Sequence, residues 1–418
     1  MREMKDSGVE WIGEIPEDWN VGKTLYALSM PITDGPHETP ELFDEGIPFI
    51  SAEAVSCGNG HIDFEHIRGF ISQEFYEECC KKYIPQINDI YMIKSGATTG
   101  KVAKVETQKL FTIWSPLAVF RVEPQRCYYE YLYYFIQSDA YQKQIENKWT
   151  YGTQQNIGMR TLEKLMICFP SITQQKLIAD YLDVKCSKID VIIEKQQAII
   201  EKLKEYKLSI INEAVTQGIN PDVNMKQSGY KWIGSIPEHW NMVYAKQLFS
   251  QRKDRAFEDD EQLTASQKYG IISQKEFMDI EGRQVMQVLK GEEILKHVEK
   301  GDFVISMRSF QGGLEYSEVS GKISSAYVML IPNRDKVCDR YYKWLFKSKK
   351  YISALQGTSN LIRDGQALRF SNFVQVYLPS LDLDEQKKIA DYLDDVCPKI
   401  DNEIEKREKL LVYWHADF

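Results

Sequence analysis

Two long segments of the chain alternate apolar and polar residues with the spacing of a coiled-coil helix. In both, the seam positions recur at alternating steps of four and three, which align one row of side chains along one side of an α-helix. The first seam is Leu182, Cys186, Ile189, Ile193, Gln196, Ile200, Leu203, Lys207, Ile210 and Ala214, and a flanking row of Ile192, Ile199 and Tyr206 widens its apolar stripe. The second seam is Leu393, Cys397, Ile400, Ile404, Arg407, Leu411 and Trp414. The pattern predicts two long helices that bury matching seams against each other.

The two segments are copies of one pattern. Each opens with the hexapeptide Ile-Ala-Asp-Tyr-Leu-Asp, at residues 178–183 and 389–394, and each is preceded by a Gln-Lys pair. A second repeat lies upstream of each helix, because Ser7 to Trp19 matches Ser228 to Trp240 through Trp-Ile-Gly-x-Ile-Pro-Glu-x-Trp. Such a long internal period indicates duplicated architecture and not a solenoid, whose repeats are much shorter. We expect the tryptophans and the Ile-Pro pair of each motif to pack onto their own domain.

Between the repeated motifs lie two variable blocks that mix short strands and helices. The predicted strands are 47–50, 90–93, 117–122, 303–306 and 326–330, and the predicted helices are 128–145 and 340–355. Gly218 and Pro221 mark the end of the first long helix. The fold class is therefore α+β, with domains at residues 1–173 and 218–382 and long helices at 174–217 and 383–418. Matching frames with divergent interiors suggest two readers of different targets.

The composition is that of an ordinary soluble protein. Of the 418 residues 43% are hydrophobic and 27% charged, and the net charge is −9. This acidic balance argues against non-specific nucleic-acid binding but allows local positive charge. The eight cysteines form no metal-binding pattern and suit a reducing cytoplasm, and we expect no signal peptide and no membrane span.

One loop in each block follows a predicted strand and carries small, hydroxylated and basic residues. The first, residues 94–101, looks like a P-loop but is one residue short between its glycines and has Val102 where magnesium needs a hydroxyl. We therefore reject nucleotide binding. A plain tight turn and a DNA-contacting loop are both open readings. As DNA contacts the candidates are Lys94, Ser95, Thr98, Thr99, Lys101, Arg308, Ser309 and Gln311.

A later loop in each block offers amide and guanidinium groups. Gln and Asn can form paired hydrogen bonds with adenine in the major groove, and Arg can do the same with guanine. The candidates are Thr153, Gln154, Asn156, Arg363 and Gln366. A polar surface loop without this role explains the same residues equally well.

No catalytic constellation is present in the sequence. We find no motif for amino methyl transfer, no glycine-rich cofactor loop, and six histidines without metal-ligand spacing. The paired Trp-Ile-Gly-x-Ile-Pro-Glu-x-Trp motifs, the paired Gln-Lys…Ile-Ala-Asp-Tyr-Leu-Asp segments and the stretch from Phe303 to Gly313 resemble the specificity subunit of a type I DNA restriction-modification enzyme. The resemblance covers nearly the whole chain.

The resemblance implies a non-catalytic subunit with two target-recognition domains, each reading one half of a split site in double-stranded DNA. The long helices would form an antiparallel coiled coil between them. Two modification subunits would bring S-adenosylmethionine and the adenine methyltransferase centre, and motor-nuclease subunits would use ATP and Mg²⁺. The chain itself would hold no cofactor and no metal. The second helix is shorter than the family pattern, which puts closure of the pseudo-twofold arrangement in question.

Two other readings stay open. The chain could be the recognition part of a fused, type II-like restriction-methylation enzyme, or a degenerate coiled-coil scaffold that no longer binds DNA. Neighbouring genes for separate methyltransferase and helicase-nuclease subunits would distinguish the first of these from the type I reading.

Overall fold

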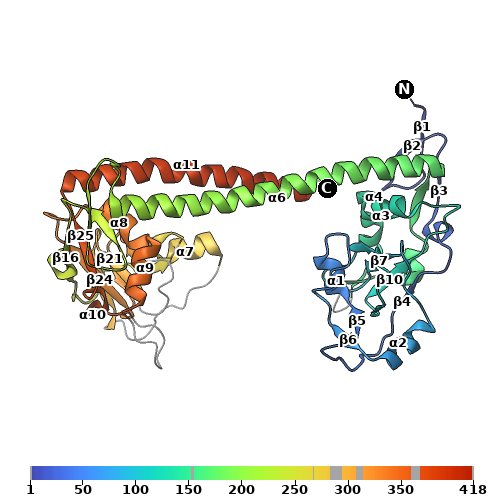
Figure 1. Cartoon of the computed structure of the whole chain (residues 1–418), viewed down its shortest axis with the longest axis horizontal. Helices are drawn as coiled ribbons and strands as arrows, with labels where there is room; N and C mark the ends of the chain where they lie inside the picture. The colour runs from blue at the N-terminus through green and yellow to red at the C-terminus, as the bar shows by residue number, and fades with distance from the viewer. Residues whose placement is uncertain are drawn as a thin grey trace. The chain divides into compact units, whose positions relative to one another are not determined.

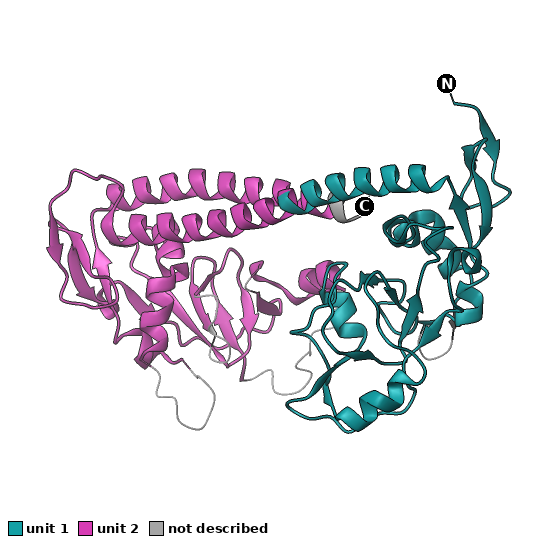
Figure 2. Ribbon diagram, turned by 45° about the vertical axis from the view of Figure 1, so that its right-hand side comes forward, with its two compact units in different colours: residues 1–191 teal, residues 192–418 magenta. Residues whose placement is uncertain are grey.

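The computed structural model describes residues 2–151, 155–266, 268–282, 294–306, 314–358 and 368–416, and only the backbone of residues 150, 151, 306 and 413–416. The chain divides into two compact units, residues 1–191 (unit 1) and 192–418 (unit 2), and the division falls inside one long helix (Figure 2). Figure 1 gives the order of the elements along the chain. The predicted mixture of helices and strands is confirmed, whereas the predicted domain limits stay a prediction.

Unit 1 is built on a four-stranded antiparallel sheet. Its strand order is β4-β10-β7-β8, with β4 at Thr33–Asp34, β10 at Leu117–Phe120, β7 at Ile90–Ile93 and β8 at Val102–Lys104. Every residue of β7 and β10 is buried, because α3 (Tyr129–Gln137) and α4 (Asp139–Glu146) cover one face and a second small sheet lies on the other. That sheet has the order β6-β5-β9, at Gly69–Ile71, Ile47–Ile50 and Thr112–Ile113. Unit 1 also contains the short helices α1 (Ala52–Cys57), α2 (Gln73–Cys80) and α5 (Met159–Leu162).

Unit 2 repeats this sheet with different residues. Its order is β17-β24-β21-β22, with β17 at Phe249–Gln251, β24 at Tyr327–Pro332, β21 at Phe303–Ser306 and β22 at Glu315–Tyr316. Two strand pairs accompany it: β18 (Leu263–Ser266) with β19 (Gly270–Ser273), and β20 (Lys296–Val298) with β23 (Gly321–Ile323). Its short helices are α7 (Gln274–Glu281) and α10 (Phe370–Phe373). The predicted common plan of the two blocks is confirmed at the level of strand order.

The repeated start motif has the same local structure in both units. It forms the pair β1 (Met4–Asp6) with β2 (Glu14–Pro16) in unit 1, and β14 (Met225–Gln227) with β15 (Ser235–Pro237) in unit 2. The motif glycines, Gly13 and Gly234, have φ of 68° and 76°, a left-handed conformation that residues with a Cβ rarely adopt. The chain then pairs β3 (Asn20–Lys23) with β13 (Met166–Phe169), and β16 (Asn241–Tyr244) with β25 (Tyr377–Ser380). Each motif is thereby held beside the start of its long helix.

The helices predicted at 128–145 and 340–355 are each broken in two. Unit 1 has α3 (Tyr129–Gln137) and α4 (Asp139–Glu146), and unit 2 has α8 (Asp339–Lys347) and α9 (Lys349–Gln356). The break is a serine in extended conformation in both cases, Ser138 and Ser348. The Ser348 hydroxyl accepts a hydrogen bond from the backbone N–H of Tyr351 and so caps the second helix. The prediction of single helices was wrong, because apolar spacing continues across a serine that starts a new helix.

The two predicted long helices are present as α6 (Ile172–Gln217, 46 residues) and α11 (Leu383–Ala416, 34 residues). Within unit 2 they run antiparallel. Lys207 Nζ lies 2.6 Å from a carboxylate oxygen of Asp401, and Arg407 Nη1 donates to Gln196 Oε1 at 2.6 Å, so higher numbers in α6 pair with lower numbers in α11. Their seams belong to one buried cluster, whose seam members are Ile200, Ile210, Ala214, Leu393, Cys397, Ile400 and Ile404. The predicted seam pairing is confirmed.

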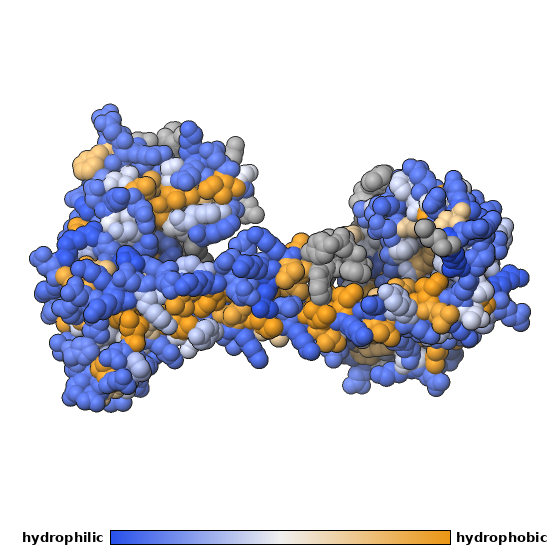
Figure 3. Space-filling view, turned by 90° about the horizontal axis from the view of Figure 1, so that it is seen from above, coloured by the Kyte–Doolittle hydropathy of each residue, from blue (hydrophilic) through white to orange (hydrophobic). Residues whose placement is uncertain are grey.

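The flanking row does not join that buried surface. Ile192, Ile199 and Tyr206 are exposed, as are Leu177, Tyr181, Val184 and Val191 on the same helix. Figure 3, which looks down on the long helices, shows apolar side chains in patches along their outer side. The row widens the apolar stripe beyond the buried seam, because two paired helices cover only the seam positions between them.

Candidate nucleic-acid interface

The two candidate loops of unit 1 lie side by side. The first, residues 94–101, connects β7 to β8, and the second lies around the pair β11 (Thr150–Tyr151) and β12 (Gln155–Asn156). Ser95 and Asn156 form a β-bridge, the backbone N–H of Gly96 donates to Gln155 O at 3.0 Å, and that of Ile157 donates to Lys94 O at 2.9 Å. Candidates some sixty positions apart in the sequence therefore share one surface.

The first loop is a tight turn that is held by its own hydrogen bonds. The Thr99 hydroxyl donates to Gly96 O at 2.7 Å, and the backbone N–H of Lys101 donates to Thr98 O at 3.3 Å. Gly100 has a φ of 97°, and a Cβ there would lie 2.4 Å from the Gln142 side chain. The loop leads into strand β8, whereas a P-loop leads into a helix.

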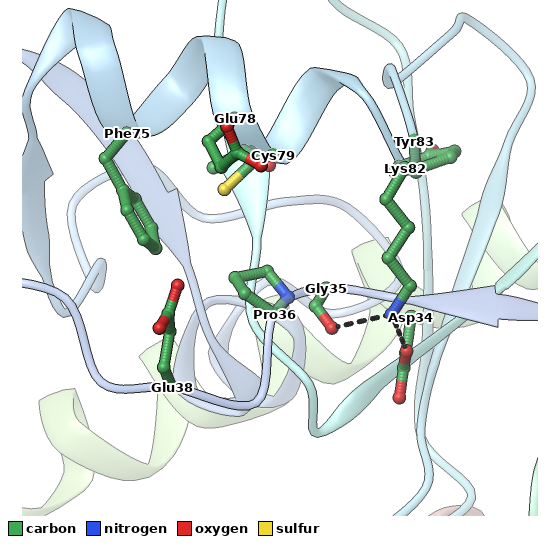
Figure 4. A pocket seen from close by; sticks show the side chains of 10 residues that line it. Asp34, Gly35, Pro36, Glu38, Phe75, Glu78, Cys79, Lys82 and Tyr83 are labelled. Carbon is green, nitrogen blue, oxygen red and sulfur yellow. Dashed lines mark hydrogen bonds and ion pairs between the residues drawn. The ribbon is translucent and has the colours of Figure 1, made fainter.

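The two lysines of this loop, Lys94 and Lys101, have different surroundings. Lys94 is only 12% exposed, and its ammonium lies 3.3 Å from a carboxylate oxygen of the buried Asp34. Lys82 also binds Asp34 and donates to the Gly35 carbonyl at 3.1 Å, beside a cavity of about 220 Å³ (Figure 4). Burial alone would raise the pKa of Asp34, but the two ammonium groups outweigh it, and its pKa lies below the usual value.

Lys101, in contrast, is exposed and makes no ion pair with any residue that the structure describes. Its charge is free to meet a phosphate, whereas Lys94 would first have to leave Asp34. Ser95, Thr98 and Thr99 are half-buried and Asn156 is exposed. Thr153, Gln154, Arg308, Ser309, Gln311, Arg363 and Gln366 lie outside the described residues, so their assignment as DNA contacts stays a prediction.

Two further basic residues were not among the candidates. Lys148 and Arg160 are exposed, and they flank the second loop, one before β11 and one in α5. Only their positions in the sequence could have indicated them, because each lies two residues outside the polar stretch 150–158. With Lys101 they give unit 1 three exposed cations on segments that border the paired loops.

The glutamine of the Gln-Lys pair in the first turns of each long helix has a structural role. Gln175 is fully buried, accepts the backbone N–H of Tyr128 at 2.8 Å and donates to Pro170 O at 2.9 Å. Gln386 does the same with Cys338 N at 2.8 Å and Leu381 O at 2.9 Å. Each glutamine therefore fixes the first turn of a long helix to the segment that leads into α3 or α8.

A second contact lies about two turns further along each helix. The Tyr134 hydroxyl donates to Asp183 in unit 1, and the Trp344 Nε1 donates to Asp394 at 2.7 Å in unit 2. These aspartates end the shared hexapeptide. The spacing between glutamine and aspartate, which is the same in both helices, sets how each unit's sheet and helices attach to its own long helix.

Within the described ranges, no three His, Cys, Asp or Glu side chains are grouped so that they could hold a metal ion. The described helices also include none that is long and apolar enough to cross a bilayer.

The duplicated sheets and the antiparallel long helices define a two-module α+β fold that includes a coiled coil. The chain belongs to the family described as the type I restriction modification DNA specificity domain, which matches residues 36–205 and 237–411.

Among individual proteins, the chain is similar to the putative type I restriction enzyme MjaX specificity subunit of Methanocaldococcus jannaschii, with 27% identity over 95% of this chain and 91% of the relative. Its fold is similar to that of the HsdS subunit from Thermoanaerobacter tengcongensis, with a TM-score of 0.54 and 13% identity over 96% of this chain and 94% of that one. It also resembles a chain from a study of complex assembly and conformational transition of the type I R-M system, with a TM-score of 0.68 and 12% identity over 96% of each chain.

Proposed function

We propose that this chain is the DNA sequence-recognition subunit of a type I restriction-modification complex and reads a bipartite site with one unit per half-site. The observation that carries the proposal is the duplication of one frame around two different interiors. Both units have the same four-strand order and the same attachment to a long helix, but their loops differ in sequence. A shared frame with different loops is what two readers of different sequences require.

In this proposal the paired loops of unit 1 meet the DNA. Lys101, Lys148 and Arg160 contact phosphates, which position the domain, and the amide groups near Asn156 reach base edges. The chain also organises the complex. Two modification subunits bring S-adenosylmethionine and the methyltransferase centre, and motor-nuclease subunits bring the ATP- and Mg²⁺-dependent steps.

A block exchange tests the two-reader assignment. Replacing residues 20–169 with the corresponding block of a relative should change one half of the methylated sequence and leave the other half unchanged. The matched control replaces residues 242–378 and should change only the opposite half. Genome-wide mapping of methylated adenines reads both results, and a change in both halves from one exchange would contradict the proposal.

A reconstitution tests the absence of catalysis in this chain. The purified chain should transfer no methyl group from S-adenosylmethionine to DNA, and it should support methylation when its cognate modification subunit is added. Methyl transfer by the chain alone would refute a purely recognising role.

A further inference from the structure

Unit 2 carries three lysines around one open pocket. The pocket has a volume of about 510 Å³ and lies where the end of α6, the start motif and α9 meet. Its lining includes Lys231, Lys349 and Lys350 beside Asn212 and Trp232, and none of the described residues that line it is acidic. The pocket therefore gathers positive charge on a chain whose net charge is −9.

The charges of these lysines are not neutralised by neighbouring side chains. Within the described ranges of the chain, Lys231, Lys349 and Lys350 make no ion pair, and the first two are exposed. Two lysines of the adjacent helix α8 differ in this respect, because Lys343 and Lys347 each pair with a glutamate, at 3.1 and 2.8 Å. Three unpaired ammonium groups that face one pocket repel each other unless an anion lies between them.

Two of the lysines stand at the unfavourable end of a helix. Lys349 and Lys350 are the first two residues of α9, where the free backbone N–H groups create a partial positive charge that favours acidic side chains. The first turn of α9 contains no acidic residue. The arrangement destabilises the free chain, whereas an anion in the pocket would be attracted by the lysines and by the helix N-terminus together.

The equivalent positions of unit 1 carry the opposite charge. Glu10 takes the place of Lys231 in the start motif, and Asp139 takes the place of Lys349 after the serine that begins the second helix. Asp139 stands where the helix favours it, and it pairs with Lys143 at 3.1 Å. Because the two units share one frame, the frame itself does not require lysines here, and their presence in unit 2 indicates a ligand of that unit.

The walls of the pocket are held in place by contacts within unit 2. Asn212 Oδ1 accepts the backbone N–H of Lys350 at 3.5 Å, which joins the end of α6 to the first turn of α9. The Trp232 ring packs edge-on against the ring of the fully buried Tyr351, with centroids 5.8 Å apart. The lysines therefore extend from a fixed framework, so an anion could bind without ordering the backbone first.

We propose that this lysine pocket of unit 2 is a binding site for a phosphate group. Lys231 of the start motif and the two lysines of α9 donate charge-assisted hydrogen bonds to the phosphate oxygens. Two sources offer this group. One is the DNA backbone outside the recognised bases, which rests on the proposed function and would add affinity without sequence information. The other is a free nucleotide or inorganic polyphosphate.

The test compares the wild-type full chain with a variant that receives the unit 1 charges, Lys231→Glu with Lys349→Asp. Both lysines are exposed, and aspartate is favourable in the first turn of α9, so the variant should fold. The matched control is Lys336→Glu with Lys388→Glu. It changes the net charge by the same amount at two exposed lysines of unit 2 that do not line the pocket.

Two binding measurements distinguish the sources of phosphate. In calorimetry at constant ionic strength, inorganic tripolyphosphate should bind the wild type and the control alike, and the variant at least about tenfold more weakly, because attraction becomes repulsion. In titrations of a short duplex of unrelated sequence, the slope of log binding constant against log salt concentration should fall by about one for each backbone phosphate that leaves the pocket. This fall should occur in the variant and not in the control.

Each outcome decides the proposal. Weaker binding in both measurements, or in the DNA titration alone, identifies the DNA backbone as the source. Loss of tripolyphosphate binding with an unchanged DNA slope identifies a free phosphate ligand. A variant that equals the control in both measurements would overturn the proposal and leave the pocket to an acidic partner surface. If the chain bound no DNA at all, the proposed function would be contradicted, but the tripolyphosphate titration would still decide whether the pocket binds phosphate.

Discussion

A four-residue insertion in α6 tests whether this helix sets the spacing between half-sites. The insertion, for example Ala-Glu-Ala-Lys, belongs directly after Val191. That position lies beyond Asp183, which fixes the helix to unit 1, and before Gln196, where the described contacts with α11 begin. An insertion near Val215 would instead disturb the buried end of α6 and its bond to Tyr341.

The expected change follows from helix and DNA geometry. Four residues lengthen an α-helix by about 6 Å and rotate whatever follows by about 40° beyond one full turn. At about 3.4 Å per base pair, 6 Å corresponds to about 1.8 base pairs, which rotate B-DNA by about 60° at 10–10.5 base pairs per turn. Advance and rotation therefore nearly agree, and the unspecified spacer should lengthen by about two base pairs with both half-sites unchanged.

A seven-residue insertion at the same place is the control for phase. It advances the helix by about 10.5 Å but leaves it about 20° short of two turns, whereas about three base pairs rotate DNA by about 105°. The mismatch of about 125° should abolish specific methylation. Mapping methylated adenines in cells with each variant reads both outcomes. An active four-residue variant with an unchanged spacer would refute the idea that the length of α6 sets the spacing between half-sites.

Three other predictions concern individual side chains. Gln175→Ala and Gln386→Ala should each lower the free energy of unfolding by about 1–3 kcal/mol, because each removes a buried amide that accepts the backbone N–H of Tyr128 or Cys338. Denaturant titrations that show no loss would contradict the role of these glutamines. Lys101→Ala should reduce the slope of log binding constant against log salt concentration by about one, without affecting unfolding. Lys94→Ala should instead destabilise the fold, because it leaves the buried Asp34 with one less counter-charge. A reduced slope for Lys94→Ala and none for Lys101→Ala would show that Lys94 is the DNA contact. Burial disfavours the charged form of His297, but hydrogen bonds to Asp260 and Glu299 outweigh this and raise its pKa. Its stabilising contribution is therefore complete below about pH 6.5 and is lost as the pH rises through the raised pKa, so unfolding of wild type and His297→Gln should differ most in mild acid and converge at alkaline pH.

The sequence by itself determined the long helices and the duplicated frame. Heptad spacing is a local property that does not depend on what the helix packs against. The identical hexapeptides and the matching start motifs reveal the duplication directly. The strands at 47–50, 90–93 and 303–306 were also predicted with their observed bounds, because short apolar runs between turn residues favour buried strands.

Only the tertiary structure decided which of these local features meet. The loops around Lys94 and Asn156 pair through backbone hydrogen bonds that no residue type encodes, and the partner of Lys94 is an aspartate sixty positions away. The same motif is buried at Trp240 and half-open at Trp19, because burial depends on the end of a helix that arrives from elsewhere in the chain. Helical periodicity is set by residues that are neighbours in the sequence, whereas the contacts and the burial of a side chain depend on how distant segments pack.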